Sequence, residues 1–318
     1  MTALSRAQGC LLGQLAGDSL GALVEFQNTA QINAAYPNGV RFLADGGTWN
    51  ILAGQPTDDS ELALALARTL VKHGTYDSKE VFKAYQDWLN SNPFDIGRTV
   101  KGALTGRLNQ KSQANGALMR VSPLGIFGVN APFETLKSWA LTDATLTHPN
   151  QLCQEANVLY VLAIALAIKT GPTPLELYRA ILDWAKEFKV DPTLLEAAQK
   201  AKDQPPDSYV KSMGWLLIAF QNALYQLVNA PNLEEGLVDT VGRGGDTDTN
   251  AAICGSLLGA VYGLTAVPTQ WREAVLNCRP QAGQPGVKRP RPEIYWPQDA
   301  LELAAYLLTG EKVALTTS

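Results

Sequence analysis

The sequence predicts an all-α protein that forms a single domain over residues 1–318. Apolar residues recur with helical spacing in most segments of the chain. Strand signals are weak: residues 39–42 and the proline-punctuated stretch 279–297 are expected to be loops or very short strands. No linker separates two halves, and 46% hydrophobic with 18% charged residues is typical of a globular chain.

The first predicted helix, residues 5–26, carries a glycine at every fourth position, namely Gly9, Gly13, Gly17 and Gly21. A helical glycine costs about 1 kcal/mol relative to alanine, so the repeat needs a compensating benefit. Residues four apart share one face of a helix, and these glycines form a smooth stripe that another backbone or a ligand can approach. We expect tight helix packing to be the larger part of that benefit.

The next predicted helix follows a glycine-rich loop over residues 36–56. Leu62, Leu66 and Leu70 repeat at helical spacing, and Gly74 ends the helix. Further helices are predicted at residues 79–90, 155–170, 174–189, 210–228 and 250–262.

The last two predicted helices carry signals of their own. A second stripe of small residues, including Gly255 and Gly259, runs along residues 250–262. The final helix is expected to start at Asp299, where Asp299 and Glu302 resemble a capping box, and to stop at Gly310.

Composition excludes several classes of protein. The net charge of −4 and pI of about 5.3 argue against nucleic-acid binding, which requires a basic face. We expect no signal peptide, and the longest apolar run, residues 158–168, is too short to span a bilayer. The four scattered cysteines are expected to be buried thiols in a reducing compartment. We therefore expect a cytoplasmic monomer without membrane contact.

Three common catalytic arrangements are also absent from the sequence. His73 and His148 are the only histidines, and no G-x-S-x-G elbow occurs, which argues against a serine hydrolase. Neither a Walker A segment nor G-x-G-x-x-G is present. His and Cys are too few, and too far apart, for a zinc site. The remaining candidate is a metal site whose ligands are the oxygens of carboxylates and hydroxyls.

Two acidic clusters, one near each end of the chain, supply such ligands. Thr57-Asp58-Asp59 opens a predicted helix, where it also suits a simple N-cap. Residues 242–249 form a glycine loop entering a helix, with Asp246, Thr247, Asp248 and Thr249 in succession. A calcium loop within this second segment is excluded, because Ala251 and Leu257 replace the required glycine and bidentate glutamate. The missing ligands must come from elsewhere, and Thr57-Asp58-Asp59 is the obvious donor.

Charge supports this pairing. Asp58, Asp59, Asp246 and Asp248 would repel one another strongly in a partly buried pocket. Two divalent cations would neutralise them, and ligation by carboxylates and hydroxyls favours the hard ions Mg²⁺ or Mn²⁺. Two such ions roughly 4 Å apart can polarise a substrate oxygen and activate water.

With these motifs the chain resembles the ADP-ribosylglycohydrolase family, which includes the dinitrogenase reductase-activating glycohydrolases and the ADP-ribosylarginine hydrolases. The matching segments follow the family order over about residues 7–263. They are Gly9-Cys10-Leu11-Leu12-Gly13, Gly17-Asp18-Ser19-Leu20-Gly21 with Glu25, Thr57-Asp58-Asp59, Asp95-Ile96-Gly97, Asn115-Gly116-Ala117-Leu118-Met119-Arg120, Thr147-His148-Pro149 and Gly244-Gly245-Asp246-Thr247-Asp248-Thr249.

The resemblance implies a compact orthogonal helical bundle with a central site for two Mg²⁺ or Mn²⁺ ions. The implied metal ligands are Thr57, Asp58, Asp59, Asp246, Asp248 and Thr249. The implied catalytic residues are Asp59, Asp95 and Glu25. The implied substrate-binding residues are Asn115, Gly116, Met119, His148, Gly242, Gly244 and Gly245.

The implied reaction is hydrolysis of the bond between the distal ribose of ADP-ribose and an acceptor. Asp95 favours arginine as that acceptor, because a carboxylate can bond a guanidinium through two parallel hydrogen bonds. Hydrolysis of serine-linked or O-acetyl-linked ADP-ribose, or of free ADP-ribose derivatives, stays open. So does a catalytically silent scaffold of crystallin type, although none of the implied ligands is missing.

Several of these residues also have plain structural interpretations. Glu25 shares a helix face with Asp18 and suits a solvated position, Met119 suits a core, and His148 before Pro149 suits a turn. Asp18 is expected to hold a neighbouring loop. Trp215 stands where a tyrosine-bearing segment is expected at the nucleotide end.

Overall fold

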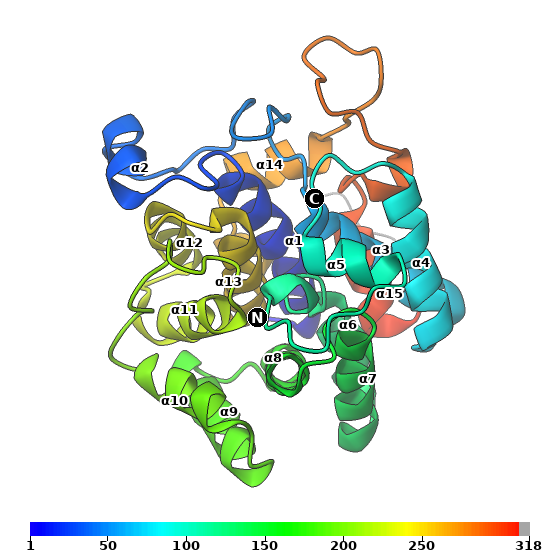
Figure 1. The fold of residues 1–318 in the computed structure, drawn as a ribbon, viewed down its shortest axis with the longest axis vertical. Helices are drawn as coiled ribbons and strands as arrows, with labels where there is room; N and C mark the ends of the chain where they lie inside the picture. Colours follow the sequence, from blue (N-terminus) through cyan, green and yellow to red (C-terminus); the bar gives the residue numbers. More distant parts are fainter. Residues whose placement is uncertain (312–318) are drawn as a thin grey trace.

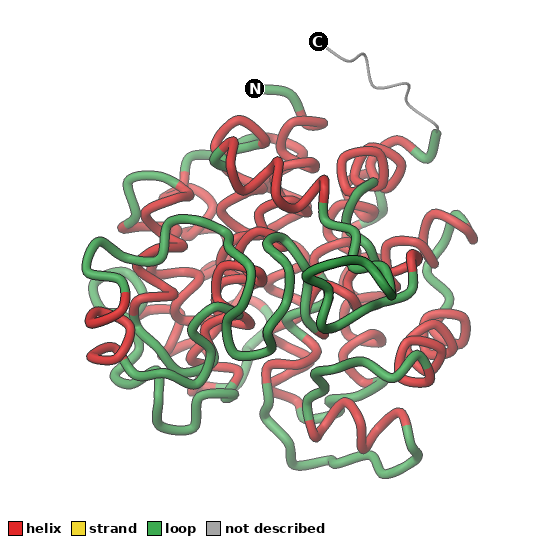
Figure 2. Tube along the Cα trace, turned by 90° about the horizontal axis from the view of Figure 1, so that it is seen from above, coloured by secondary structure: helices red, strands yellow, loops and turns green. Residues whose placement is uncertain are grey.

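Helices account for nearly all regular structure in this computed structural model, which describes residues 1–311. Fifteen α-helices and four short 3-10 helices occur there. No strand occurs among these residues, and the trace in Figure 2 shows helices joined by loops, with only isolated bridges such as Asn28 to Gly244. The all-α prediction is confirmed. Residues 312–318 of the predicted single domain lie outside the described part of the chain.

The helices follow in chain order. They are α1 (Ala3–Gly21), α2 (Thr29–Ala35), α3 (Asp58–His73), α4 (Ser78–Asn90), α5 (Arg98–Leu104), α6 (Ser122–Phe127), α7 (Phe133–Thr145), α8 (Gln151–Thr170), α9 (Pro174–Glu187), α10 (Pro192–Lys200), α11 (Leu216–Asn229), α12 (Leu233–Gly242), α13 (Thr247–Tyr262), α14 (Thr269–Asn277) and α15 (Ala300–Thr309).

The two glycine-striped helices, α1 and α13, pack directly against each other in the middle of the molecule (Figure 1). A Cβ atom placed on Gly13 would overlap the carbonyl oxygen of Gly255, and one on Gly259 would overlap that of Gly9. The helices therefore touch backbone to backbone. This confirms the packing explanation of both stripes. Because Gly21 lies against Thr247 and Asp248, the end of α1 meets the start of α13.

A single cluster of buried apolar side chains runs through the described residues, with elements from α1 to α15 contributing. One helix in it, α8, has 20 residues and is long and apolar enough to span a membrane. The apolar run of residues 158–168, expected to be too short for this, is only its central part. In the structure, 78% of its most apolar window is buried, as is usual for a core helix. All four cysteines are free and buried, as predicted.

Two predicted helix boundaries are wrong. The first helix ends at Gly21 rather than near residue 26, because Phe26 adopts a left-handed conformation (φ 67°) and its N–H bonds the carbonyl of Gly245. The helix predicted from residue 210 begins only at Leu216. The intervening residues form turns that line a cavity.

The predicted capping box at the start of α15 is also wrong, although the helix begins and ends where expected. Asp299 makes no side-chain cap. Its carboxylate is instead bound by Arg68 on α3, at 2.6 and 2.8 Å. A charge-assisted bidentate pair is stronger than a bond to a backbone N–H, so the tertiary contact prevails.

The proline-punctuated segment before α15 crosses α3 and the loops around the cavity. The Arg291 guanidinium bonds both carboxylate oxygens of Glu61 at 2.8 Å and the Ser91 carbonyl at 2.9 Å. Arg289 Nε donates to the Trp49 carbonyl at 3.0 Å. The segment thus holds two loops, one leading to Asp95 and one carrying Trp49.

Candidate active site

A cavity of about 940 Å³ opens where the ends of α1, α3 and α13 meet. Its volume lies at the upper end of the range for small-molecule sites, about 300–1,000 Å³. Its lining comes from segments far apart in the sequence, and it includes most of the predicted site residues. Those that line it are Glu25, Asp58, Asp59, Asp95, Asn115, Gly116, Met119, His148, Asp246, Asp248 and Thr249.

Asp18 fixes the start of α3, as predicted. This fully buried carboxylate accepts hydrogen bonds from the Thr57 N–H at 3.1 Å, the Thr57 hydroxyl at 2.8 Å and the Ser60 N–H at 3.1 Å. Thr57 therefore occupies the N-cap position without capping the helix through its side chain. The first turn of α3 is held by another helix, which explains how Asp58 and Asp59 keep their positions.

Asp59 provides the clearest sign of a missing ligand. Its Oδ2 lies 3.0 Å from the Thr57 hydroxyl, which shares its single hydrogen between Asp59 and Asp18, whereas its buried Oδ1 has no partner among residues 1–311. Buried polar atoms are nearly always bonded, so an orphan needs an explanation. Asp58 beside it accepts a single bond, from the Gly97 N–H at 3.2 Å.

Asp246 and Asp248 enter the cavity from the start of α13. Asn115 Nδ2 donates to Asp246 Oδ2 at 2.7 Å, and the Thr249 N–H donates to Asp248 Oδ1 at 2.8 Å. Asp246 and the α3 cluster line the same cavity, although 187 residues separate Asp59 from Asp246. The expected convergence of the two acidic segments is present in the structure.

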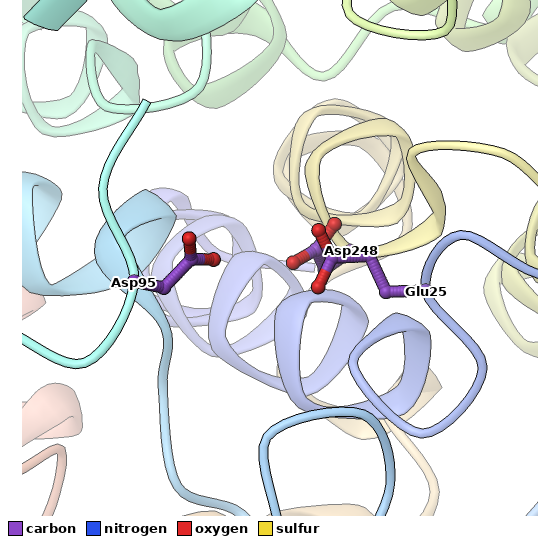
Figure 3. Close-up of side chains that lie close together, drawn as sticks. All are labelled: Glu25, Asp95 and Asp248. Atoms are coloured by element: carbon purple, nitrogen blue, oxygen red, sulfur yellow. The ribbon is translucent and has the colours of Figure 1, made fainter. Parts of the chain in front are cut away.

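Glu25, Asp95 and Asp248 form the tightest acidic group. One oxygen atom of each lies within 4.8 Å of the others, a spacing that could hold a metal ion. In Figure 3 Asp95 approaches from its loop on one side, while Glu25 and Asp248 face it from the other. Trp49 Nε1 donates to Glu25 Oε2 at 2.6 Å and orients that side chain. Glu25 is buried, so the solvated interpretation of it is wrong.

Burial and mutual repulsion raise the pKa values of these acids. Burial, followed by the charges of Asp95 and Asp246, raises the pKa of Glu25 to about 8. Burial raises the pKa of Asp95 to about 6. Burial and neighbouring acids, including Glu25 and Asp59, raise the pKa of Asp248 well above its usual range. No Lys or Arg of the described chain forms an ion pair with any acid lining this cavity.

These residues fit a divalent cation. All the available donors are oxygens, which favours Mg²⁺ or Mn²⁺, and Asp59 Oδ1 lacks a partner. The tightest group shares only Asp248 with the predicted ligands; Glu25 and Asp95 were predicted as catalytic residues. Thr57 lies behind Asp59, outside the cavity lining. The full ligand set stays a prediction.

Three of the four glycines predicted to contact substrate, Gly242, Gly244 and Gly245, do not line the cavity, whereas Gly116 does. The Gly245 N–H bonds the Gln27 carbonyl at 2.8 Å, and a Cβ on Gly244 would lie 2.5 Å from the same oxygen. Both have positive φ values, near +80°. They join the loop before α13 to the segment after α1. Gly242 is the last residue of α12.

Two aromatic residues at the site were not predicted to act there. Trp49 comes from an irregular loop without a sequence motif, so nothing in the sequence pointed to its bond with Glu25. Trp215 lines the cavity with 40% of its surface exposed and donates from Nε1 to Gln113 at 3.0 Å. The sequence indicated only that Trp215 stands near the expected nucleotide end.

The fold and the site define a class: an all-helical protein whose central cavity gathers carboxylates from distant segments, with no arginine or lysine of residues 1–311 in an ion pair with them. A sequence model described as ADP-ribosylglycohydrolase matches residues 1–309. The chain therefore belongs to the ADP-ribosylglycohydrolase family.

Individual relatives agree with this assignment. The chain is 30% identical over 281 residues to ADP-ribosyl-[dinitrogen reductase] glycohydrolase of Rhodospirillum rubrum, covering 84% of this chain and 88% of that protein. It is 28% identical to ADP-ribosylarginine hydrolase Tri1 of Pseudomonas putida, covering 86% and 75%. A solved chain of an ADP-ribosylglycohydrolase-related protein complex superposes with a TM-score of 0.77 at 27% identity, covering 96% and 99%. The protein is a hydrolase of the type that releases ADP-ribose from modified acceptors.

Proposed function

We propose that the protein is a divalent-metal-dependent hydrolase that releases ADP-ribose from modified arginine side chains of proteins. One observation carries the proposal: Asp58, Asp59, Asp246 and Asp248 line one cavity that is large enough for a nucleotide sugar, and Glu25 and Asp95 lie in the same wall. The similarity to an ADP-ribosylarginine hydrolase supports the choice of acceptor.

We assign different roles to the acids of the cavity: four would bind the cation, and Glu25 would handle a proton. Asp58, Asp59, Asp246 and Asp248 would hold the cation, with Thr57 and Asn115 orienting two of their carboxylates. When bound, Mg²⁺ or Mn²⁺ supplies positive charge that polarises a substrate oxygen and lowers the pKa of water. Glu25 is buried in the cavity wall and held by Trp49, so its carboxylate is placed to keep or transfer a proton there.

Asp95 gives the proposal its acceptor specificity. It is half-buried on a loop at the cavity wall, and its carboxylate can bond a guanidinium through two parallel hydrogen bonds. A serine-linked substrate presents no such cation. With a pKa raised to about 6, Asp95 can also exchange a proton near neutral pH as the glycosidic bond breaks.

The test compares Asp95→Ala with Asp248→Ala on ADP-ribosylarginine, with Mn²⁺ affinity measured in parallel by calorimetry. Asp95→Ala is expected to lower kcat/KM by about 100-fold, the lower limit for a general acid or base, and to keep most of the Mn²⁺ affinity. Asp248→Ala is expected to lose both. Asp183→Ala, on the exposed side of α9, is the matched control.

Two outcomes would contradict the proposal. If Asp95→Ala loses as much Mn²⁺ affinity as Asp248→Ala, Asp95 is a ligand and its role toward arginine fails. If the wild-type protein cleaves only serine-linked or O-acetyl-linked ADP-ribose, the acceptor is wrong.

A further inference from the structure

A buried polar network lies behind the cavity wall opposite the acids. Its centre is Arg120, which is fully buried. Nε of Arg120 bonds Asp143 Oδ2 at 3.3 Å, Nη2 bonds the Asp143 carbonyl at 3.0 Å, and Nη1 bonds the Thr147 hydroxyl at 2.7 Å. A guanidinium is always charged and can only donate hydrogen bonds. The Thr147 oxygen is therefore an acceptor in this contact.

The other partner of the Thr147 hydroxyl is His148, whose Nδ1 lies 2.8 Å away. Neutral imidazole carries one proton, on Nδ1 or on Nε2. If Nδ1 carried it, Thr147 would accept two bonds and its own hydrogen would have no acceptor. Nε2 would then be a second unsatisfied atom. If the Thr147 hydroxyl donates to Nδ1, both groups are satisfied and only the Nε2–H is left.

The charge of Arg120 favours the same arrangement. The guanidinium lies on the Nδ1 side of the ring, through Thr147, where a lone pair is more favourable than an N–H. Burial, together with Arg120, lowers the pKa of His148 to about 3, so the ring is neutral at ordinary pH.

The opposite edge of His148 carries a nitrogen without a partner in residues 1–311. Its Nε2 is buried, has no hydrogen-bond partner among the described residues, and belongs to a side chain that lines the cavity. Gly116 stands next to it: an added Cβ would lie 3.1 Å from Cε1 and 3.3 Å from Nε2 of this ring. The absence of a side chain at position 116 keeps this edge of the ring approachable.

We propose that Arg120 and Thr147 are positioning residues that fix His148 with its proton on Nε2, so that this uncharged ring donates a hydrogen bond to an oxygen of the ADP-ribose moiety in the cavity. The proposal rests on the proposed function only in taking ADP-ribose as the ligand, which all acceptor types share. In this tautomer Nε2 of His148 can only donate a hydrogen bond. The ring does so without a positive charge, unlike the ammonium of lysine or the guanidinium of arginine.

The tautomer can be read directly in the wild-type protein by nitrogen NMR of ¹⁵N-histidine. Only His73 and His148 contribute, and His73→Gln removes the other signal. We expect His148 to show a protonated Nε2 and an unprotonated Nδ1. A proton on Nδ1, or a rapid average of both forms, would overturn the proposal. Neither result depends on which acceptor the enzyme cleaves.

Variants then separate positioning from simple structure. Thr147→Val keeps the shape but cannot donate, so it is expected to lose the fixed tautomer and to bind ADP-ribose about 10-fold more weakly by calorimetry. Thr147→Ser keeps the hydroxyl and should restore both. Unchanged tautomer and affinity in Thr147→Val would contradict the inference.

Gly116→Ala supplies a variant that changes no side chain of the network and keeps the Gly116 carbonyl, which accepts a hydrogen bond from Arg120 Nη1 at 3.3 Å. It leaves Arg120, Thr147 and His148 intact and partly covers the ring edge, so ADP-ribose affinity should fall about 10-fold while the NMR signature stays that of wild type. ADP-ribose affinity equal to that of wild type would show that the ligand does not reach Nε2. Should Thr147→Val fail to fold, the wild-type spectrum and Gly116→Ala still decide the matter.

Discussion

Two sets of buried carboxylates differ in what neutralises them. Glu61 and Asp143 each have a buried arginine, Arg291 and Arg120, and further donors in Trp88 Nε1 and the Tyr85 hydroxyl. The acids of the cavity have no such partner within the described chain, and Asp59 keeps an unbonded oxygen. Removing a charge from water costs several kcal/mol unless it is paired. The first set is compensated by the fold, whereas the second has no compensating positive charge among the residues that the structure describes.

The largest expected change in stability concerns the carboxylates that are paired with buried arginines. Arg291→Met should lower the free energy of unfolding by about 3–5 kcal/mol, because it leaves Glu61 buried and unpaired. Urea unfolding measures the change. Arg279→Met, at an exposed position of the same segment, is the control. Adding Glu61→Gln should recover part of the loss. Equal stability of Arg291→Met and wild type would remove the basis of the comparison.

A smaller effect of opposite sign is expected in the cavity. Without metal, Asp248→Asn should raise the melting temperature, because it removes one of several repelling charges. In wild type, Mn²⁺ at a hundred times its dissociation constant should stabilise the fold by about 2.7 kcal/mol, a gain that chelator reverses. Asp58→Asn should blunt this response. A melting curve indifferent to both Mn²⁺ and chelator would leave the N-cap interpretation of Thr57-Asp58-Asp59 standing.

The smallest expected effect is a pH dependence of the metal-free protein. The folded-state pKa of Glu25 is raised from 4.5 to about 8, so the folded state holds a proton that the unfolded state has released between these values. Stability should therefore fall as pH rises from 5.5 to 7.5, by about 2.5 kcal/mol, because 1.36 kcal/mol is lost over nearly every pH unit of this interval. Mn²⁺ should flatten this slope. A metal-free protein that gains stability over the same interval would contradict the raised pKa.

Local sequence patterns predicted the central helix pair and several helix ends. The glycine repeats of Gly9 to Gly21 and Gly255 to Gly259 gave the central helix pair, and Gly74 and Gly310 marked helix ends correctly. Seven of the fifteen described α-helices went unpredicted, and α12 is one of them. Gly236 stands in its middle and lowers helix propensity, yet a Cβ there would lie 2.6 Å from a Leu258 methyl group. Propensity and packing conflict at this residue, and packing prevails.

The site was predictable where chemistry concentrates in short motifs and unpredictable where it depends on tertiary contact. Thr57-Asp58-Asp59 and residues 246–249 carry enough oxygen ligands in sequence to predict a shared cavity. By contrast, the bond from Trp49 to Glu25 and the contact of Arg291 with Ser91 join segments without motifs. The predicted capping box failed for the same reason. The Asp299 carboxylate bonds the guanidinium of Arg68 on another helix instead of a backbone N–H of its own helix.

The backbone contact between α1 and α13 makes one side of the acidic site rigid. Side chains at an ordinary helix interface can change rotamer to absorb a small shift, but glycines against carbonyl oxygens have no such freedom. Glu25 follows the end of one of these helices and Asp248 lies in the first turn of the other, so the close packing of the two backbones sets their separation. Asp95 approaches from a loop instead (Figure 3). Any adjustment to ions or acceptors of different size must therefore come from the loop that carries Asp95.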